Sequence, residues 1–87
     1  MEKVEVILNN KTGLHARPAS VITKVASRFK SDIKITKDGR EGNAKSIVSI
    51  LSIAAVYGDS LFISAEGIDD MEAITTIKQL IENNFVE

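Results

Sequence analysis

The sequence predicts an α+β fold in which a four-stranded antiparallel sheet carries three helices on one face, in the order β-α-β-β-α-β-α. Three observations lead to this prediction: segments that alternate polar and apolar residues, apolar stripes at helical spacing, and an Asp-Gly turn. Amphipathic helices and such a sheet pack most simply as two layers, with the second sheet face left to water. We expect residues 1–87 to form a single domain, because 87 residues with 44% hydrophobic content suffice for one modest core.

The first strand and the first helix are separated by a short turn. Residues 3–8 alternate as a half-buried strand does, and residues 9–13 break the pattern with turn-forming types. Residues 16–29 then carry apolar side chains three and four positions apart, which predicts a helix. Pro18 fits that helix only in its first turn, where an N–H group would be unpaired in any case. His15 therefore lies at the helix N-terminus.

The second and third strands are predicted to form a hairpin. Residues 32–36 alternate again, and Asp38–Gly39 is a dipeptide typical of a tight hairpin turn. The returning strand over residues 40–45 has weak strand propensity and contains Gly42. We therefore expect it to be short, bulged or at the edge of the sheet.

Residues 46–56 are compatible with either a strand or a helix. Their β-branched residues favour a strand, whereas Ile47, Ile50 and Leu51 have helical spacing. We predict a short helix that follows Ser46, because serine is a preferred residue at a helix N-cap.

The fourth strand is predicted over residues 60–67. Leu61 and Ile63 are placed on one face, and Phe62 and Ala65 on or near the other. A turn at residues 57–59 precedes the strand.

The last helix follows a capping pattern. Asp69 and Glu72 have the Asp-x-x-Glu spacing that predicts a helix start, with the Asp69 side chain as the cap. The apolar stripe of this helix consists of Ile74, Ile77, Leu80 and Ile81.

The composition excludes several kinds of site. A net charge of −1 without a block of like charge predicts no broad surface for nucleic acid or anionic membrane. Without cysteine, disulfides, thiolate metal sites and thiol nucleophiles are excluded, and one histidine cannot make a histidine-rich metal site. We expect no cofactor. No apolar run reaches the length of a signal peptide or a membrane span, so we expect a cytoplasmic protein without membrane insertion.

His15 is the candidate chemical group of the chain. A lone histidine near a helix start is more often a cap or a surface residue. Here, however, unpaired N–H groups of the helix N-terminus and the guanidinium of Arg17 favour an anion held on the imidazole, and Gly13 permits a tight turn before it. These features describe a histidine that can carry a phosphoryl group. The sequence has no nucleotide-binding phosphate loop and no carboxylate cluster for Mg²⁺, so the donor would be another protein.

Two segments resemble a known family. Residues 12–19, TGLHARPA, resemble the active-site signature of HPr, the histidine-containing phosphocarriers of the phosphoenolpyruvate-dependent sugar phosphotransferase system. Residues 43–55 are similar to the second segment of that family, and the length and the element order agree along essentially the whole chain. The resemblance implies an open-faced β-sandwich. The sequence departs from the family at Gly42, where an apolar strand residue is usual, and at Ser49, where glycine is common.

The resemblance also implies a function. His15 would accept a phosphoryl group on its pros nitrogen from phospho-enzyme I and pass it to sugar-specific IIA domains, with Arg17 stabilising charge and with no catalytic turnover of the carrier itself. Ser46 would be phosphorylated by an HPr kinase/phosphorylase, and the phosphoserine form would bind a catabolite-control repressor protein; Ser46 as a simple N-cap is the alternative. The residues implied to bind partners are Thr12, Ala16, Ser20, Lys24, Ile47, Val48 and Leu51.

Two other functions remain open at the level of sequence. A regulatory paralogue of HPr would act through phosphorylated Ser46 alone, but such paralogues differ from the carriers at the position of His15. A small-ligand-binding α/β domain would use His15 only structurally. The sequence does not identify the sugars or the IIA partners, because specificity lies in those partners, and a monomer suits transient transfer.

Overall fold

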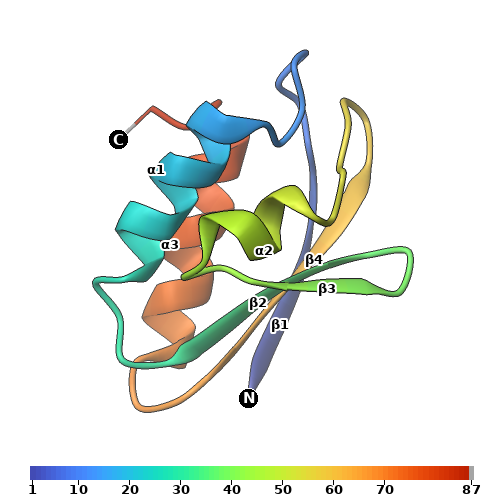
Figure 1. Cartoon of the computed structure of the whole chain (residues 1–87). Coiled ribbons are helices and arrows are strands. Elements are labelled where there is room, and N and C mark those ends of the chain that lie inside the picture. The colour runs from blue at the N-terminus through green and yellow to red at the C-terminus, as the bar shows by residue number, and fades with distance from the viewer. Residues whose placement is uncertain (87) are drawn as a thin grey trace.

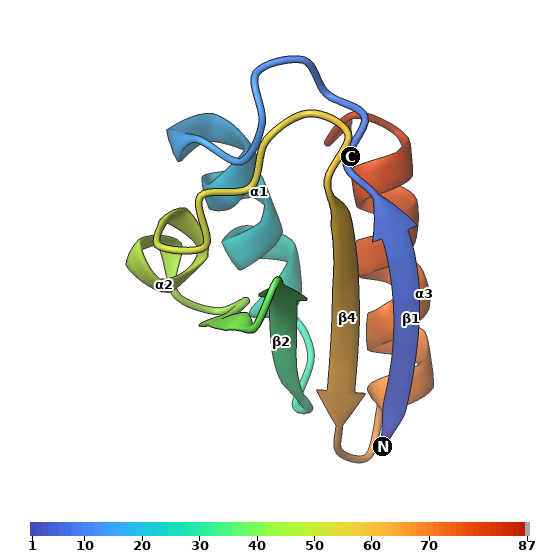
Figure 2. The ribbon, with the colours of Figure 1, turned by 90° about the vertical axis from the view of Figure 1, so that its right-hand side faces the viewer.

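A computed structural model describes residues 1–86 and confirms the predicted order of the elements (Figure 1). The strands are β1 (Glu2–Ile7), β2 (Asp32–Lys37), β3 (Arg40–Asn43) and β4 (Ser60–Glu66), and the helices are α1 (Ala16–Ala26), α2 (Ile47–Leu51) and α3 (Asp70–Glu82). The strands form one antiparallel sheet in the order β1-β4-β2-β3. The three helices lie on one face of this sheet, as Figure 2 shows, and the other face is open.

The hydrophobic core lies between the sheet and the helices. In β1, β2 and β4 the side chains alternate, so that one set is turned towards the helices and the other faces outward. The largest fully buried hydrophobic side chains are Leu8, Ile22, Ile33, Ile35, Ile50, Ile53, Leu61, Ile63, Ile77 and Ile81. The core thus joins all three helices to the sheet and makes a rigid base for the loops at its ends.

The prediction for β4 is wrong at Ala65. Leu61, Ile63 and Ala65 are all buried on the same face, because residues two apart in a strand point the same way. Phe62 faces outward as predicted and is 39% exposed. The Lys3 ammonium lies 4.8 Å from the centre of its ring, an arrangement that covers part of the open sheet face.

Helix α1 is shorter than predicted. It ends at Ala26, where the N–H and the hydroxyl of Ser27 both donate to the carbonyl of Thr23. The side chain of Phe29 nevertheless packs, partly buried, against the core from the segment that follows. The apolar stripe therefore extends past the C-terminal end of α1.

The β2–β3 hairpin has the predicted turn and a short edge strand. Asp38 and Gly39 have φ values of 49° and 80°, and two consecutive positive φ values are characteristic of a type I′ turn. Gly42 lies in β3 with no room for a side chain, because an added Cβ would lie 2.7 Å from Cδ1 of Ile53 and 2.8 Å from the carbonyl oxygen of Ser49. The segment from α2 to Ile53 thus occupies the space that an apolar side chain at position 42 would fill.

The capping role predicted for Asp69 is also wrong. Asp69 occupies the N-cap position of α3, but its carboxylate makes no cap hydrogen bond. It accepts instead from the N–H of Lys30 at 2.9 Å and from the N–H and hydroxyl of Ser31 at 2.9 and 2.5 Å. The carboxylate therefore ties α3 to the loop between α1 and β2, a long-range contact that competes with local capping.

Candidate functional site

The loop between β1 and α1 is held against the segment that follows α2. The N–H of Leu14 donates to the carbonyl of Ala55 at 3.0 Å. Gly13 has φ +73°, and a Cβ there would lie 2.7 Å from the same carbonyl oxygen. Glycine is therefore required at this position both by the backbone conformation and by the close approach of Ala55. The packing fixes where the next residue, His15, enters α1.

His15 occupies the N-cap of α1, as predicted, in an extended conformation with φ −96° and ψ −166°. Its side chain makes no cap hydrogen bond, while its carbonyl accepts from the N–H of Ala19 at 3.0 Å. The residue is exposed, and Pro18 is buried in the first helical turn. The backbone thus starts the helix and leaves the imidazole accessible at the helix start.

The charge at this end of α1 favours an anion. The first turn contains no acidic residue, and Arg17 is exposed. Within residues 1–86, neither His15 nor Arg17 makes a side-chain hydrogen bond or an ion pair. The unpaired N–H groups and the positive end of the helix dipole add to the charge of the guanidinium. An anion bound to the imidazole would therefore meet donors already in place.

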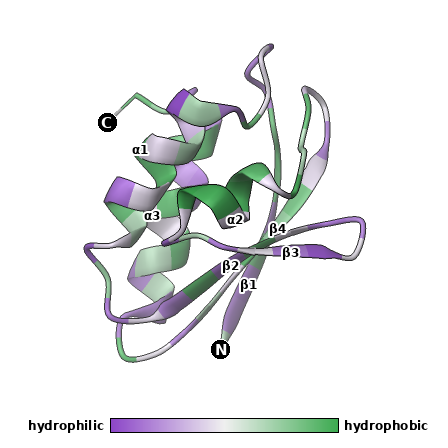
Figure 3. Cartoon of the chain, viewed as in Figure 1, coloured by the Kyte–Doolittle hydropathy of each residue, from purple (hydrophilic) through white to green (hydrophobic). Residues whose placement is uncertain are grey.

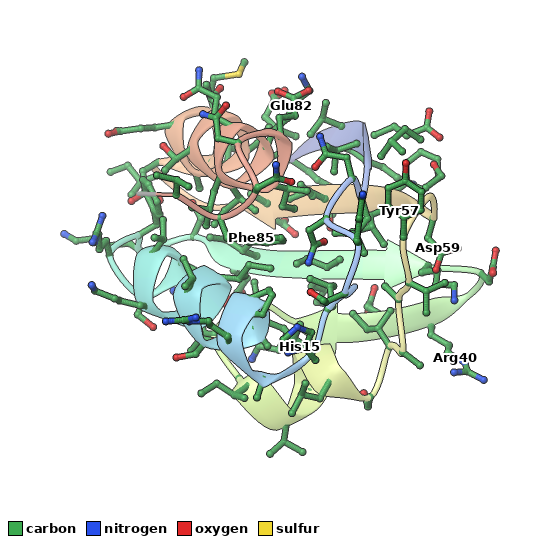
Figure 4. All side chains as sticks on the ribbon, turned by 90° about the horizontal axis from the view of Figure 1, so that it is seen from above. His15, Arg40, Tyr57, Asp59, Glu82 and Phe85 are labelled. Carbon is green, nitrogen blue, oxygen red and sulfur yellow. The ribbon has the colours of Figure 1, made fainter. Side chains whose placement is uncertain are left out.

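His15 and Arg17 share one surface groove of about 480 Å³. Its walls come from the β1–α1 loop, the first turns of α1 and the segment after α3, and Figure 4 looks onto this end of the molecule. The lining residues are Asn10, Thr12, His15, Arg17, Pro18, Val21, Asn84 and Phe85. Thr12, which the resemblance implied to bind partners, therefore lines the same groove as His15.

Outside α1, three residues of the groove were not predicted from the sequence. Asn10 stabilises the loop, since its side-chain nitrogen donates to the carbonyl of Gly13 at 2.8 Å and to Oγ1 of Thr12 at 3.3 Å. The turn-forming residues 9–13 predict the end of the first strand, but they do not by themselves predict that Asn10 supports the loop before His15. No sequence pattern predicts Asn84 and Phe85 as groove residues, because they follow the last helix and reach the groove only through the tertiary fold.

Ser46 occupies the N-cap of α2, as predicted. Its hydroxyl accepts from the N–H of Ser49 at 3.3 Å, and its carbonyl accepts from the N–H of Ile50 at 3.0 Å. The hydroxyl of Ser49 in turn accepts from the N–H of Asn43 at 2.8 Å. Ser49 thus links the helix start to the end of β3, so the serine has a structural role where the family commonly has glycine.

The predicted partner-binding residues of α2 are all exposed. Ile47, Val48 and Leu51 are 40, 77 and 38% exposed, whereas Ile50 is fully buried. Figure 3 shows α2 as strongly hydrophobic and the β3 hairpin as hydrophilic. The three exposed side chains form an apolar patch on the surface, called here the α2 patch.

The predicted partner-binding residues of α1 lie on one exposed stripe. Ala16, Ser20 and Lys24 are four residues apart and are all exposed. Helix α1 packs against α2, so this stripe and the α2 patch belong to neighbouring elements. The two predicted sets of residues therefore lie on exposed parts of two helices that pack against each other.

Over residues 1–86, no three or more His, Cys, Asp or Glu side chains are grouped so that they could hold a metal ion. None of the described helices has the length and apolar character needed to cross a bilayer.

Comparison with known proteins finds similarity to HPr proteins along nearly the whole chain. A family model described as the PTS HPr component phosphorylation site matches residues 2–83. The phosphocarrier protein HPr of Mycoplasma pneumoniae is 41% identical over 87 residues, which is 99% of each chain. The crystal structure of HPr-C-His from Thermoanaerobacter tengcongensis is similar with a TM-score of 0.94 and 46% identity, and the match covers 100% of this chain and 98% of that one.

A regulatory relative is similar as well. The crystal structure of Crh, a catabolite-repression protein of Bacillus subtilis, matches with a TM-score of 0.79 and 36% identity and covers 100% of both chains. That protein is described as an intertwined dimer with a swapped domain. The chain is thus similar both to proteins named HPr and to the HPr-like protein Crh.

Proposed function

This chain belongs to the HPr family of phosphocarriers, and on that premise we propose that it carries a phosphoryl group on His15 between phospho-enzyme I and sugar-specific IIA domains. One observation carries the proposal: an exposed imidazole at the N-terminus of α1 shares a groove with Arg17. The family membership supports the carrier role, and the geometry of the groove supports His15 as the residue that carries the phosphoryl group.

The proposed transfer needs positioning and charge more than covalent assistance. The pros nitrogen of His15 uses its lone pair to bond to phosphorus, and the donor keeps the electron pair of the bond that breaks. The N–H groups at the start of α1 and the guanidinium of Arg17 stabilise the charge on the phosphoryl oxygens. The same steps run in reverse order when the group passes to an acceptor, so the carrier has no turnover of its own.

The proposed docking surface consists of the α2 patch, the exposed α1 stripe and Thr12. Exposed apolar clusters on small proteins commonly mark interfaces, and this one lies on the helix that packs against α1. Transient transfer suits small interfaces and a monomer that acts as one domain in the cytoplasm. The dimeric state described for Crh makes sedimentation of this chain a direct check of that proposal.

Regulation through Ser46 is the second proposal. Its hydroxyl lies at the N-cap of α2, beside the α2 patch. A phosphate added there by an HPr kinase/phosphorylase brings a charge of about −1.5 to −2 and is compatible with the helix dipole. The phosphoserine form would slow docking of carrier partners and bind a catabolite-control repressor protein. A purely regulatory paralogue is disfavoured, because the chain retains the histidine and a groove around it.

The primary test is phosphorylation by phosphoenolpyruvate and enzyme I. The expected product is an acid-labile, base-stable phosphohistidine on the wild-type chain and on a Ser46→Ala control, and none on His15→Ala. Phosphorylation of His15→Ala under the same conditions would overturn the assignment of the phosphoryl group to His15. Failure of the wild-type chain to accept phosphate would reject the carrier function.

A further inference from the structure

The segment after α3 returns to the His15 groove through an unfavourable backbone conformation. Asn84 and Phe85 have φ values of 55° and 66°, both in the left-handed region. The N–H of Phe85 donates to the carbonyl of Leu80 at 2.8 Å, and that of Asn84 donates to the carbonyl of Ile81 at 3.2 Å. Asparagine tolerates this region, but for a bulky aromatic residue it is rare. Something in the surrounding structure must therefore compensate at Phe85.

The ring of Phe85 supplies that compensation by packing. It is partly buried against the hydrophobic core, and it lines the groove together with Pro18 and Val21 of α1. Figure 4 shows Phe85 between α3 and α1, on the end of the molecule where His15 begins α1. The strained turn thus brings an aromatic ring back to the groove instead of letting the chain leave it. Strain of this kind is often found at functional sites.

The ring is chemically unlike the polar part of the groove wall. The groove is also lined by the polar residues Asn10, Thr12, Arg17 and Asn84. The Phe85 ring, in contrast, has no conventional donor or acceptor with which to hold or activate water. Because His15 is exposed, the groove shields its imidazole only in part. Removal of the ring would widen the groove on the α3 side and let more water reach the imidazole from that side. Exclusion of water protects a reactive intermediate from hydrolysis.

We propose that Phe85 is a positioning residue of the phosphoryl-carrying site, which closes the groove on its α3 side and slows hydrolysis of phosphorylated His15. This inference rests on the proposed function. In the reaction that it slows, the oxygen of water bonds to phosphorus while the N–P bond breaks. The imidazole keeps the electron pair of that bond, and the products are inorganic phosphate and unmodified histidine. Phe85 thereby favours transfer to a partner over loss to solvent.

The test measures hydrolysis without any partner protein. Phosphoramidate transfers its phosphoryl group to an imidazole nitrogen and releases ammonia, so it loads His15 chemically. After removal of the reagent, ³¹P NMR at neutral pH follows conversion of phosphohistidine to inorganic phosphate. Phe85→Ala is expected to hydrolyse at least about threefold faster than wild type, whereas Phe85→Leu, which keeps an apolar side chain, stays close to wild type.

Two further variants distinguish the effect of losing the ring on hydrolysis from the effect of losing stability. Phe85→Gly removes the ring and also relieves the positive φ, so it should hydrolyse as fast as Phe85→Ala even if the alanine variant folds poorly. Ile77→Val lowers the melting temperature through the core of α3, away from the groove, and should leave hydrolysis unchanged. Equal hydrolysis rates for wild type and a folded Phe85→Ala or Phe85→Gly would overturn the proposal.

The chemical loading keeps this inference distinct from the carrier function. If enzyme I does not phosphorylate the wild-type chain, the carrier function fails whatever the hydrolysis rates are. If enzyme I phosphorylates it but the Phe85 variants hydrolyse at the wild-type rate, only the role of Phe85 fails.

Discussion

The carboxylate of Asp69 accepts a hydrogen bond of 2.5 Å from the hydroxyl of Ser31, although 38 residues separate them in the sequence. Ser31 is fully buried, and its N–H donates to the same carboxylate oxygen at 2.9 Å. The hydroxyl of Ser31, followed by the N–H of Lys30, lowers the pKa of Asp69 to about 2. The contact holds the start of α3 to the loop that leads into β2.

The first prediction is a loss of stability in acid. The pKa of Asp69 is lower in the folded chain than its ordinary value of about 3.9. The contribution of Asp69 to the free energy of unfolding is therefore complete above about pH 3.9 and is lost as the pH falls towards about 2. In urea denaturation, the free energy of unfolding of the wild-type chain should decrease over this pH range, and that of Asp69→Asn should decrease less. The variant retains some dependence, since the N–H of Val56 and the Lys37 ammonium lower the pKa of Asp59 as well. An identical pH dependence in wild type and variant would contradict the prediction.

The second prediction concerns Arg17. Arg17→Gln should lower kcat/KM for phosphoryl transfer from phospho-enzyme I by roughly tenfold to a hundredfold, because a charged donor in the groove is lost. Arg40→Gln is the matched control: it removes the same charge from the β3 end of the molecule, far from His15 in Figure 4. Equal effects of the two substitutions on kcat/KM would show that the transfer depends on the overall charge of the chain and not on the position of Arg17.

The third prediction separates the surface of α2 from its core. Val48 is 77% exposed and Ile50 is fully buried, although they are two residues apart. Val48→Asp should raise KM for transfer with enzyme I and change the free energy of unfolding by no more than about 0.5 kcal/mol. Ile50→Ala should lower the free energy of unfolding by about 2–5 kcal/mol. Unchanged kinetics in Val48→Asp would remove this residue from the docking surface.

The fourth prediction tests the two roles of Ser46. Ser46→Ala should lower the free energy of unfolding by about 1 kcal/mol, because α2 loses the side-chain acceptor for the N–H of Ser49. Ser46→Asp should restore stability, since aspartate is also a good N-cap, while its charge beside the α2 patch slows transfer. Denaturation and transfer kinetics on the same pair distinguish capping from charge. Normal transfer in Ser46→Asp would argue against regulation by charge at this position.

The position of His15 could be predicted from sequence, whereas the groove around it could not. Pro18 restricts where α1 starts, and that local rule places His15 at the helix N-terminus. Phe85 reaches the same groove only because α3 packs beside α1 and its last turn reverses the chain, which no short-range pattern specifies. The error at Asp69 has the same origin, because the N–H groups of Lys30 and Ser31 compete for a carboxylate that local spacing assigns to a cap.

The fifth prediction uses two glycines to isolate the support of the His15 loop. Gly13 and Gly58 have φ values of +73° and +89°, so alanine at either position costs about 1 kcal/mol of backbone strain. An added Cβ at Gly58 meets no atom within 4 Å, whereas at Gly13 it lies 2.7 Å from the carbonyl oxygen of Ala55. That oxygen also accepts from the N–H of Leu14, so relief of the clash must displace the segment that leads into His15.

Gly13→Ala should therefore lose more stability than Gly58→Ala, by a further amount of about 1–3 kcal/mol. It should also slow phosphoryl transfer, whereas Gly58→Ala should leave transfer unchanged. Urea denaturation and transfer from phospho-enzyme I, measured on both variants, give the comparison. If the two variants lose the same stability and transfer equally well, the contact between Gly13 and Ala55 does not position the loop. If only the stability differs, the loop tolerates displacement, and the placement of His15 depends on the start of α1 alone.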